Sequence, residues 1–279
     1  MLKADLHIHT TASDGRLSPT QVVHAAAQTD LDVIAITDHD TTDGYQEALV
    51  AAGQTALQVL RGVEISTVFA GRECHLLAYG FDNNEAMMHL LSRQKTRRNE
   101  RAMAIIASLA RLGFALDFEE VRAEAGRAPI GRPHIARILV KKGYVATTRE
   151  AFLRYLGKRE YAMQTPGYPE TTEVVQVVHN AGGVAVLAHP AGRYNFIEIK
   201  HLKDHGLNGI ECYHPSHNSS HRHRYLEYCN NHGLLATGGS DFHGNVHDYY
   251  NLGVVQCQIA PDSPFLQSIV HSAGVLTET

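Results

Sequence analysis

The segment Ala4–Thr10, which reads Ala-Asp-Leu-His-Ile-His-Thr, places His7 and His9 two residues apart in an apolar run, and Asp14 follows after a short loop. Side chains at positions i and i+2 of a β-strand point to the same side. Two imidazoles therefore project together from the end of a first strand, with a carboxylate close by. Imidazole and carboxylate groups in this arrangement can bind a metal ion.

Strand-like and helix-like segments alternate after this first strand. A helix is predicted from Ser18 to about Thr29, because Ser18 can cap it, Pro19 suits its first position and Gln21 can close a capping box. Further strands are predicted at 33–37, 57–66, 73–79, 183–188, 209–214, 234–237 and 253–259, and further helices at 43–52, 172–181 and 219–232. This alternation favours a parallel sheet, closed into an α/β barrel of about seven strands whose carboxyl ends gather the active groups.

Residues 83–165 interrupt this alternation and are predicted to be entirely helical. Four helix starts are expected, at Asn83 or Asn84, at Asp117 with Glu120, at Gly131–His134, and at Thr147 with Glu150. We therefore expect residues 1–82 and 166–279 to form the barrel. Residues 83–165 are expected to form an inserted helical lid over its mouth.

The composition limits the class of protein. With 279 residues, 44% of them hydrophobic, the chain can bury one large core and a small inserted subdomain. A net charge of −4 argues against a protein that coats nucleic acid or binds a membrane surface. The four cysteines are scattered, which is typical of reduced thiols, and no signal peptide or membrane-spanning run is evident. We expect a cytoplasmic protein with no membrane contact and no obligate protein partner.

Histidine and carboxylate residues recur at or near nearly every predicted strand end. The nine candidate metal ligands are His7, His9, Asp14, His39, Glu64, His75, His189, Asp241 and His243. A single histidine at a strand end is more often a satisfied polar residue than a ligand, so the hypothesis rests on the joint pattern. Nine ligands with one bridging carboxylate could hold three divalent metals. The absence of thiolate ligands suits Zn²⁺, Mn²⁺ or Fe²⁺, and such clusters activate water and bind phosphate oxygens.

Two carboxylates, Asp38 and Asp40, flank His39. One of them, with Asp38 as our candidate, could orient a ligand imidazole from behind the metal site. The alternative is that both cap the next helix.

The insert offers candidate anion-binding groups. The segment Gly131–Ala136 begins a helix, whose free N–H groups and positive dipole end favour anions. Arg132 adds a planar guanidinium that suits phosphate, and His134 adds another donor. The alternative is an ordinary helix start with polar residues.

Basic residues elsewhere in the insert are weaker candidates. Arg97, Arg98 and Arg101 lie on the long predicted helix, and Lys158 and Arg159 follow later. They form either a solvated face or an anion-binding wall opposite the metals, where Arg98, Arg101 and Lys158 are our candidate substrate contacts. Two anion sites, together with the metals and the lid, indicate a substrate with two phosphates, or with a phosphodiester beside a terminal phosphate.

Five separated motifs resemble, in order, those of the PHP (polymerase and histidinol phosphatase) family. They are His7-Ile8-His9, Thr37-Asp38-His39, Gly62-Val63-Glu64, Ala188-His189-Pro190 and Ser240-Asp241-Phe242-His243. The resemblance implies a distorted (β/α)₇ barrel with a trinuclear metal site. It implies that one metal is held by His7, His9, Glu64 and Asp241, a second by Glu64, His75 and His189, and the third by Asp14, His39 and His243. Asp14 stands where some members carry His, so the metal identity stays open.

The insert and its Gly131–Ala136 motif are similar to one branch of this family, which acts on nucleoside 3′,5′-bisphosphates and short 5′-phosphorylated oligonucleotides. The resemblance implies a metal-dependent phosphatase that removes the 3′-phosphate of a substrate such as adenosine 3′,5′-bisphosphate. A hydroxide bridging the metals would attack the 3′-phosphorus, while the insert holds the 5′-phosphate. Mn²⁺ is the expected ion, with Zn²⁺ and Fe²⁺ as alternatives.

Other functions compete with this one. The first is a 5′→3′ exonuclease on short oligonucleotides, with Tyr144, Tyr155 and Tyr161 as stacking candidates, although the absence of Trp and the acidic balance favour smaller substrates. The second is a histidinol phosphate phosphatase, which would leave the second anion site without a role. An amidohydrolase and a non-enzymatic binding module are the remaining alternatives.

Overall fold

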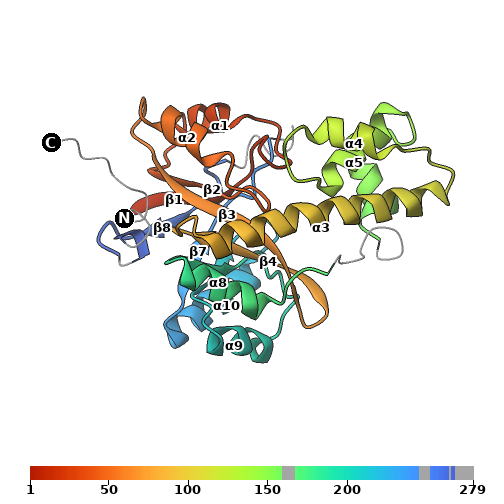
Figure 1. Cartoon of the computed structure of the whole chain (residues 1–279). Coiled ribbons are helices and arrows are strands. Elements are labelled where there is room, and N and C mark those ends of the chain that lie inside the picture. Colours follow the sequence, from red (N-terminus) through yellow and green to blue (C-terminus); the bar gives the residue numbers. More distant parts are fainter. Residues whose placement is uncertain (159–166, 245–251, 264, 268–279) are drawn as a thin grey trace.

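The strands that the structure describes form one curved sheet in the order β7-β6-β5-β4-β3-β2-β1-β8 (Figure 1). The structure is a computed structural model that describes residues 1–158, 167–244, 252–263 and 265–267. The strands are β1 Leu2–Ile8, β2 Val33–Ile36, β3 Gln58–Phe69, β4 Arg72–Tyr79, β5 Val184–Leu187, β6 Gly209–Tyr213, β7 Leu235–Gly238 and β8 Cys257–Ile259. The α/β barrel is confirmed, with β8 added antiparallel to β1.

The expectation of a fully parallel sheet is wrong for β4, which runs antiparallel to both β3 and β5. The cause is the two-residue link between β3 and β4. Ala70 and Gly71 both have positive φ, 50° and 70°, as a tight hairpin turn requires. A parallel return would need a crossover of about a dozen residues. His75 therefore lies opposite Ser66 within the hairpin and not at a carboxyl end.

The segment after β7 packs against β1 and so brings the first and last parallel strands of the barrel together. A Cβ at Gly239 would lie 2.4 Å from the Cβ of His7, so only glycine allows this approach. The Ser240 N–H donates to the buried Asp5 carboxylate at 2.9 Å, and the His9 N–H donates to the Phe242 carbonyl at 2.9 Å. These contacts place Asp241 and His243 beside His7 and His9.

Helices cover the outside of the barrel. They are α1 Pro19–Ala26, α2 Tyr45–Ala52, α8 Thr171–Asn180, α9 Phe196–Asp204 and α10 Ser219–His232. The capping box of Ser18 and Gln21 is confirmed, although α1 ends at Ala26, three residues earlier than expected. Helix α9 was not predicted, although Asn195 and Glu198 form a capping box at its start.

The insert begins with the 26-residue helix α3, Glu85–Ala110, which extends away from the barrel in Figure 1. The other helices of the insert that the structure describes are α4 Phe118–Ala125, α5 Arg132–Lys141 and α6 Thr148–Ala151, followed by a π-helical turn at Phe152–Leu156. The four predicted helix starts are confirmed, at Asn84, Asp117, Gly131 and Thr147.

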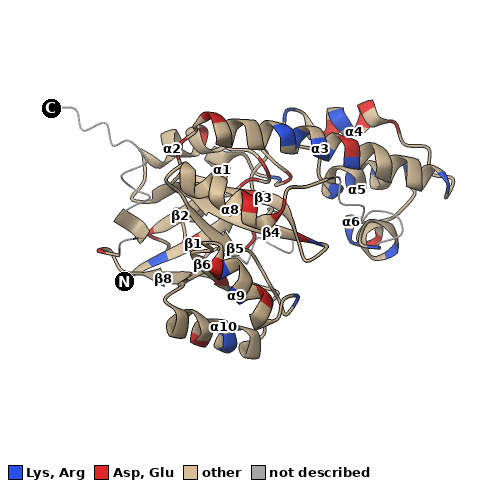
Figure 2. Cartoon of the chain, turned by 60° about the horizontal axis from the view of Figure 1, so that its bottom comes forward, with Lys and Arg blue, Asp and Glu red and all other residues tan. Residues whose placement is uncertain are grey.

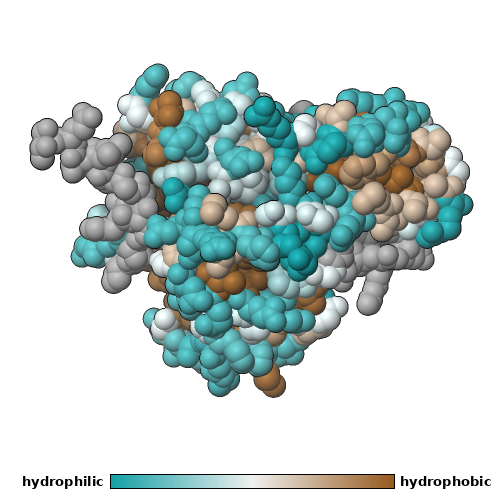
Figure 3. Space-filling model, viewed as in Figure 1, coloured by the Kyte–Doolittle hydropathy of each residue, from teal (hydrophilic) through white to brown (hydrophobic). Residues whose placement is uncertain are grey.

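Helix α3 belongs to two hydrophobic clusters. Met87 and Leu90 pack with barrel residues, whereas Ile105 and Leu109 pack with α4 and α5 in a second cluster. Figure 3 shows hydrophobic residues at the surface of this helical part. The domain limits at 82/83 and 165/166 stay predictions, and the second lies outside the described residues. None of the described helices has both the length and the apolar character needed to cross a bilayer.

Candidate metal centre and anion site

The site is centred on Glu64 of β3, a fully buried carboxylate on which five imidazoles converge. Its Oε2 lies 3.2 Å from Nε2 of His7, 3.2 Å from Nε2 of His9 and 3.1 Å from Nδ1 of His39, and its Oε1 lies 2.6 Å from Nδ1 of His75 and 2.8 Å from Nε2 of His189. One carboxylate thus has imidazoles on both oxygens, the arrangement of a bridging ligand. The hairpin of β3 and β4 delivers both Glu64 and His75 to this point.

Two further carboxylates extend the cluster. Asp241 Oδ1 lies 3.2 Å from Nε2 of His9 and 3.5 Å from Nε2 of His7. Asp14 lies 3.3 Å from Nε2 of His243 and 3.9 Å from Nε2 of His39. The structure therefore brings all nine predicted side chains into one continuous cluster. That they bind metal stays a proposal.

The donor spacing fits divalent ions. Four metal ligands at bond lengths of 2.0–2.1 Å stand roughly 3.3 Å apart in a tetrahedron, and the two Nε2 atoms of His7 and His9 are 3.1 Å apart. Within the described part of the chain, Nδ1 of His39 is buried and has no hydrogen-bond partner, although Glu64 is close. A buried nitrogen of this kind needs a partner, and a metal ion between it and the carboxylate would supply one.

Mutual electrostatics already polarise the cluster. Burial would raise the pKa of Glu64, but His39, His75 and His7 outweigh it and hold the pKa well below its usual value. Burial would lower the pKa of His75, but the carboxylates of Glu64 and Glu73 raise it to about 9. Metal binding requires neutral imidazoles, so divalent ions would replace protons in this cluster.

Asp38 supports the loop that carries Asp14. Its carboxylate accepts hydrogen bonds from the Thr10 N–H at 2.7 Å, the Thr10 hydroxyl at 2.7 Å and the Ser13 hydroxyl at 2.6 Å, and Ser13 Oγ lies 3.5 Å from Nδ1 of His9. The alternative that Asp38 and Asp40 cap the next helix is wrong, because α2 begins after Gly44 without a side-chain cap. A role for Asp38 in orienting a ligand imidazole stays a proposal.

Three groups in the site were not predicted. Glu211 on β6 contacts His7, His214 follows β6 and lies 3.4 Å from Asp241, and Glu73 on β4 lies 3.5 Å from His75. The sequence did hold a signal for Glu211, because a glutamate between Ile210 and Cys212 in a buried strand needs a partner.

The start of α5 packs against the metal-site loop. A Cβ at Gly131 would lie 3.3 Å from Asp14 Oδ2, and the Arg137 guanidinium donates to the Asp14 carbonyl. His134 Nδ1 accepts the Gly131 N–H at 2.9 Å, so the proton of the neutral ring is on Nε2. The predicted anion-binding helix start therefore adjoins the candidate metal cluster, with Nε2–H of His134 as a donor.

Glu73 connects this helix start to the cluster from the other side. It accepts two hydrogen bonds from Arg101, at 2.8 and 2.9 Å, and lies 3.8 Å from the Arg132 guanidinium. Arg98 is buried and pairs with Asp40 and the Ser66 hydroxyl. Contacts of Arg98, Arg101 and Arg132 with substrate stay predictions.

Lys158 lies apart from these groups. It lines a hollow of the helical part with Phe114 and Arg154, and no residue of the metal cluster lines that hollow. A substrate contact by Lys158 stays a prediction, and Arg159 and Tyr161 lie outside the described residues.

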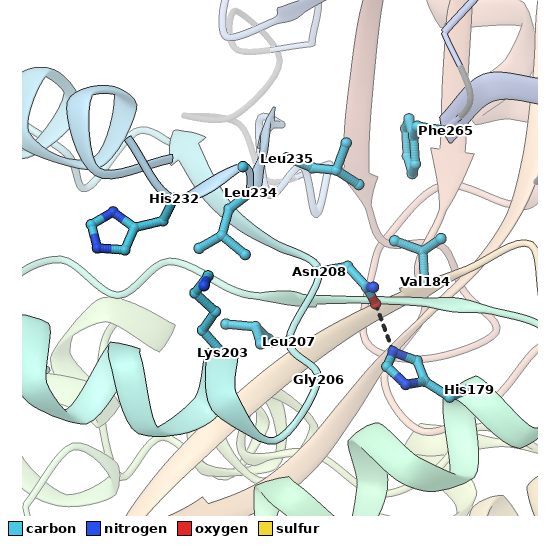
Figure 4. A pocket seen from close by; sticks show the side chains of 11 residues that line it. His179, Val184, Lys203, Gly206, Leu207, Asn208, His232, Leu234, Leu235 and Phe265 are labelled. Atoms are coloured by element: carbon cyan, nitrogen blue, oxygen red, sulfur yellow. Dashed lines mark hydrogen bonds between the residues drawn. The ribbon is translucent and has the colours of Figure 1, made fainter. Parts of the chain in front are cut away.

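A larger hollow, of about 630 Å³, lies at the opposite end of the strands (Figure 4). Its lining includes Val184, Asn208 and Leu235, at or before the starts of β5, β6 and β7, and His179 bonded to Asn208. None of the nine clustered residues lines it. In α/β barrels the chemistry lies at the carboxyl ends of the strands, so this hollow is not the candidate active site.

The burial of His134 makes a pH-dependent contribution to stability. Burial lowers its pKa from 6.5 to about 4, so the unfolded chain binds more protons between these values and stability falls as pH drops through them. We expect wild type to lose about 3 kcal/mol relative to His134→Gln between pH 7.5 and pH 4. Gln keeps an acceptor for the Gly131 N–H but does not titrate. Equal pH profiles in urea unfolding of the two metal-free proteins would contradict this result.

The fold and the cluster are those of a metal-dependent phosphoesterase, and comparison with known proteins agrees with this class. Residues 5–162 match the PHP domain model, and the chain belongs to the PHP family. The non-enzymatic alternative is therefore set aside.

Curated relatives differ in activity and include exoribonucleases, a nucleoside bisphosphate phosphatase and a phosphoribosyl 1,2-cyclic phosphate 1,2-diphosphodiesterase. The chain is 36% identical to a 5′-3′ exoribonuclease of Haemophilus influenzae, over 86% of this chain and 90% of that one. It is also 36% identical to a 3′,5′-nucleoside bisphosphate phosphatase of Chromobacterium violaceum, over 87% and 88%. A solved structure from Bifidobacterium adolescentis, assigned as a metal-dependent phosphoesterase, superposes with a TM-score of 0.82 at 32% identity and covers 96% of both chains.

Proposed function

We propose that the chain removes the 3′-phosphate of nucleoside 3′,5′-bisphosphates, with three divalent ions, Mn²⁺ by preference, held by the nine clustered residues. The observation that carries this proposal is the position of the α5 start. Arg132 and His134 lie there between Asp14 and Glu73, at the edge of the cluster. Two adjacent anion-binding features match a substrate with two phosphates.

The distribution of charge supports an anionic substrate. Residues 83–165 hold 16 of the 25 Lys and Arg residues but only 8 of the 29 Asp and Glu residues. Figure 2 shows basic residues on α3, α5 and α6 of this helical part. The chain is therefore acidic overall but basic around the proposed substrate, which concentrates anions there.

Bound divalent ions would activate water and neutralise charge on the phosphoryl oxygens. The chain's own groups bind and orient the rest of the substrate. Arg132 and the Nε2–H of His134 donate to the 5′-phosphate. In the reaction, the oxygen of water bonds to the 3′-phosphorus, the bond between O3′ and that phosphorus breaks, and a proton from the water ends on O3′. The products are the nucleoside 5′-monophosphate and inorganic phosphate.

A 5′→3′ exonuclease activity on short 5′-phosphorylated oligonucleotides is the second candidate, favoured by the exoribonuclease among the relatives. It would break the same O3′–phosphorus bond, with a further nucleotide on the phosphorus. The proposed stacking residues support it less. Tyr144 and Tyr155 pack against Phe114, with ring centroids 5.0 and 4.9 Å apart, within the helical cluster.

The test compares kcat/KM for adenosine 3′,5′-bisphosphate, a 5′-phosphorylated trinucleotide and histidinol phosphate with the Mn²⁺-loaded protein. We expect the bisphosphate to be the best substrate. Preference for the trinucleotide would favour the exonuclease, and preference for histidinol phosphate would overturn both nucleotide proposals.

Arg132→Ala should reduce the preference for a 5′-phosphate. A lost charge-assisted hydrogen bond is worth about 1.5–3 kcal/mol, so we expect kcat/KM for the bisphosphate to fall by roughly 10- to 100-fold. The value for a nucleoside 3′-monophosphate should change little. Arg127→Ala, an exposed arginine of the same insert, is the matched control. An unchanged ratio of the two substrates in Arg132→Ala would show that Arg132 does not bind the 5′-phosphate.

A further inference from the structure

Glu211 is a fully buried carboxylate on β6 that the proposed mechanism does not use. One of its oxygens lies 2.9 Å from Nδ1 of His7 on β1, on a strand 204 residues away in sequence. The other accepts the backbone N–H of His189 at 2.7 Å. The Glu211 carboxylate therefore contacts two of the proposed metal ligands, one through each of its oxygens.

The contact with His7 determines which nitrogen of that ring faces the cluster. A carboxylate oxygen only accepts, so Nδ1 of His7 carries the hydrogen that it donates to Glu211. Nε2 is then left with its lone pair, and it points toward His9, Glu64 and Asp241 at 3.1, 3.2 and 3.5 Å. Metal-bound histidines are commonly oriented by such a carboxylate on the far nitrogen.

The contact with His189 acts on the backbone. His189 has φ of +25°, which is unfavourable for a residue with a Cβ. The hydrogen bond from its N–H to Glu211 helps to hold this conformation. In it, Nε2 of His189 reaches Glu64 at 2.8 Å.

We propose that Glu211 is a positioning residue that holds His7 and His189 ready for two neighbouring metal ions. This inference rests on the proposal that these histidines bind metal. It predicts that Glu211 sets the affinity of the cluster for metal without itself being a ligand.

Glu211→Gln keeps the shape of the side chain and tests this role. Its amide can still accept from His189 through oxygen, but it then presents N–H groups to Nδ1 of His7. The His7 ring must then either turn or carry its hydrogen on Nε2. A hydrogen on Nε2 would occupy the lone pair that faces the metal. We expect Mn²⁺ affinity, measured by calorimetric titration of metal-free protein, to weaken by roughly 10- to 100-fold with an unchanged number of ions per chain.

Thr237→Val is the matched control. Thr237 pairs with Glu211 in the sheet, is buried, and has no hydrogen bond from its hydroxyl within the described residues. This variant should bind Mn²⁺ like wild type. If Glu211→Gln does not fold, Glu211→Asp replaces it, because Asp keeps the charge but is too short to reach both histidines and should also bind more weakly.

The outcomes separate the two proposals. Wild-type affinity in Glu211→Gln, or in Glu211→Asp where that variant is used, overturns the positioning role. A loss of one ion per chain, with the others bound normally, shows Glu211 to be a ligand and also overturns it. If wild type itself binds no Mn²⁺, the metal site fails, and the inference fails with it.

Discussion

Glu64→Gln should reduce kcat/KM by roughly 10³-fold or more and should release metal from the cluster. Among the described residues, Glu64 is the only one of the nine proposed ligands that contacts five imidazoles, three on one oxygen and two on the other. Gln has nearly the same shape but no charge, and one of its ends is a donor. It can neither offset two cations nor present lone pairs to both groups of ligands.

The measurement is metal content per chain by mass spectrometry, together with steady-state kinetics on the bisphosphate. Glu85→Gln, which neutralises an exposed glutamate at the start of α3, should leave both values unchanged. Retention of a full metal complement by Glu64→Gln would show that Glu64 does not bridge. A thermal melt of the metal-free variant separates this loss from unfolding.

The features that the sequence predicts correctly are those with a local signal. His7 and His9 share one face of a strand because of their spacing, and Asn84, Asp117 and Thr147 begin helices because their side chains cap the following turn. The cluster itself follows from barrel topology, since the carboxyl ends of the parallel strands meet. His75 shows the limit of this reasoning, because it reaches Glu64 through an antiparallel hairpin that was not predicted.

The features that the sequence does not reveal depend on contacts between distant residues. The apolar strand around Glu211 indicates that this glutamate needs a partner, but nothing near it in the sequence identifies His7 and His189 as the partners. Arg98 was predicted to face substrate because it lies in a run of basic residues. In the structure its partner is Asp40, 58 residues earlier, and no local pattern identifies such a pair.

Arg98→Met should destabilise the protein by about 3 kcal/mol or more, because it leaves Asp40 buried without its cation. Both side chains are at most 5% exposed. Asp40 lies at positive φ, 53°, directly after His39, and also accepts the Ser66 N–H at 2.8 Å. Arg98 in turn donates to the Ser66 hydroxyl at 2.8 Å. This pair therefore connects helix α3 to residues that closely follow the proposed metal ligands His39 and Glu64.

A double-mutant cycle with Asp40→Asn measures the coupling free energy between Arg98 and Asp40. Asn is the suitable replacement because it also tolerates positive φ. Removing both charges should cost at least about 1 kcal/mol less than the sum of the single changes in urea unfolding. Arg93→Met, an exposed arginine on the same helix, should change stability by no more than about 0.5 kcal/mol. If Arg98→Met were as mild as Arg93→Met but abolished the preference for the bisphosphate, Arg98 would be a substrate contact. If instead the cycle shows coupling, the arginine that recognises the 5′-phosphate has to be sought at the start of α5, at Arg132.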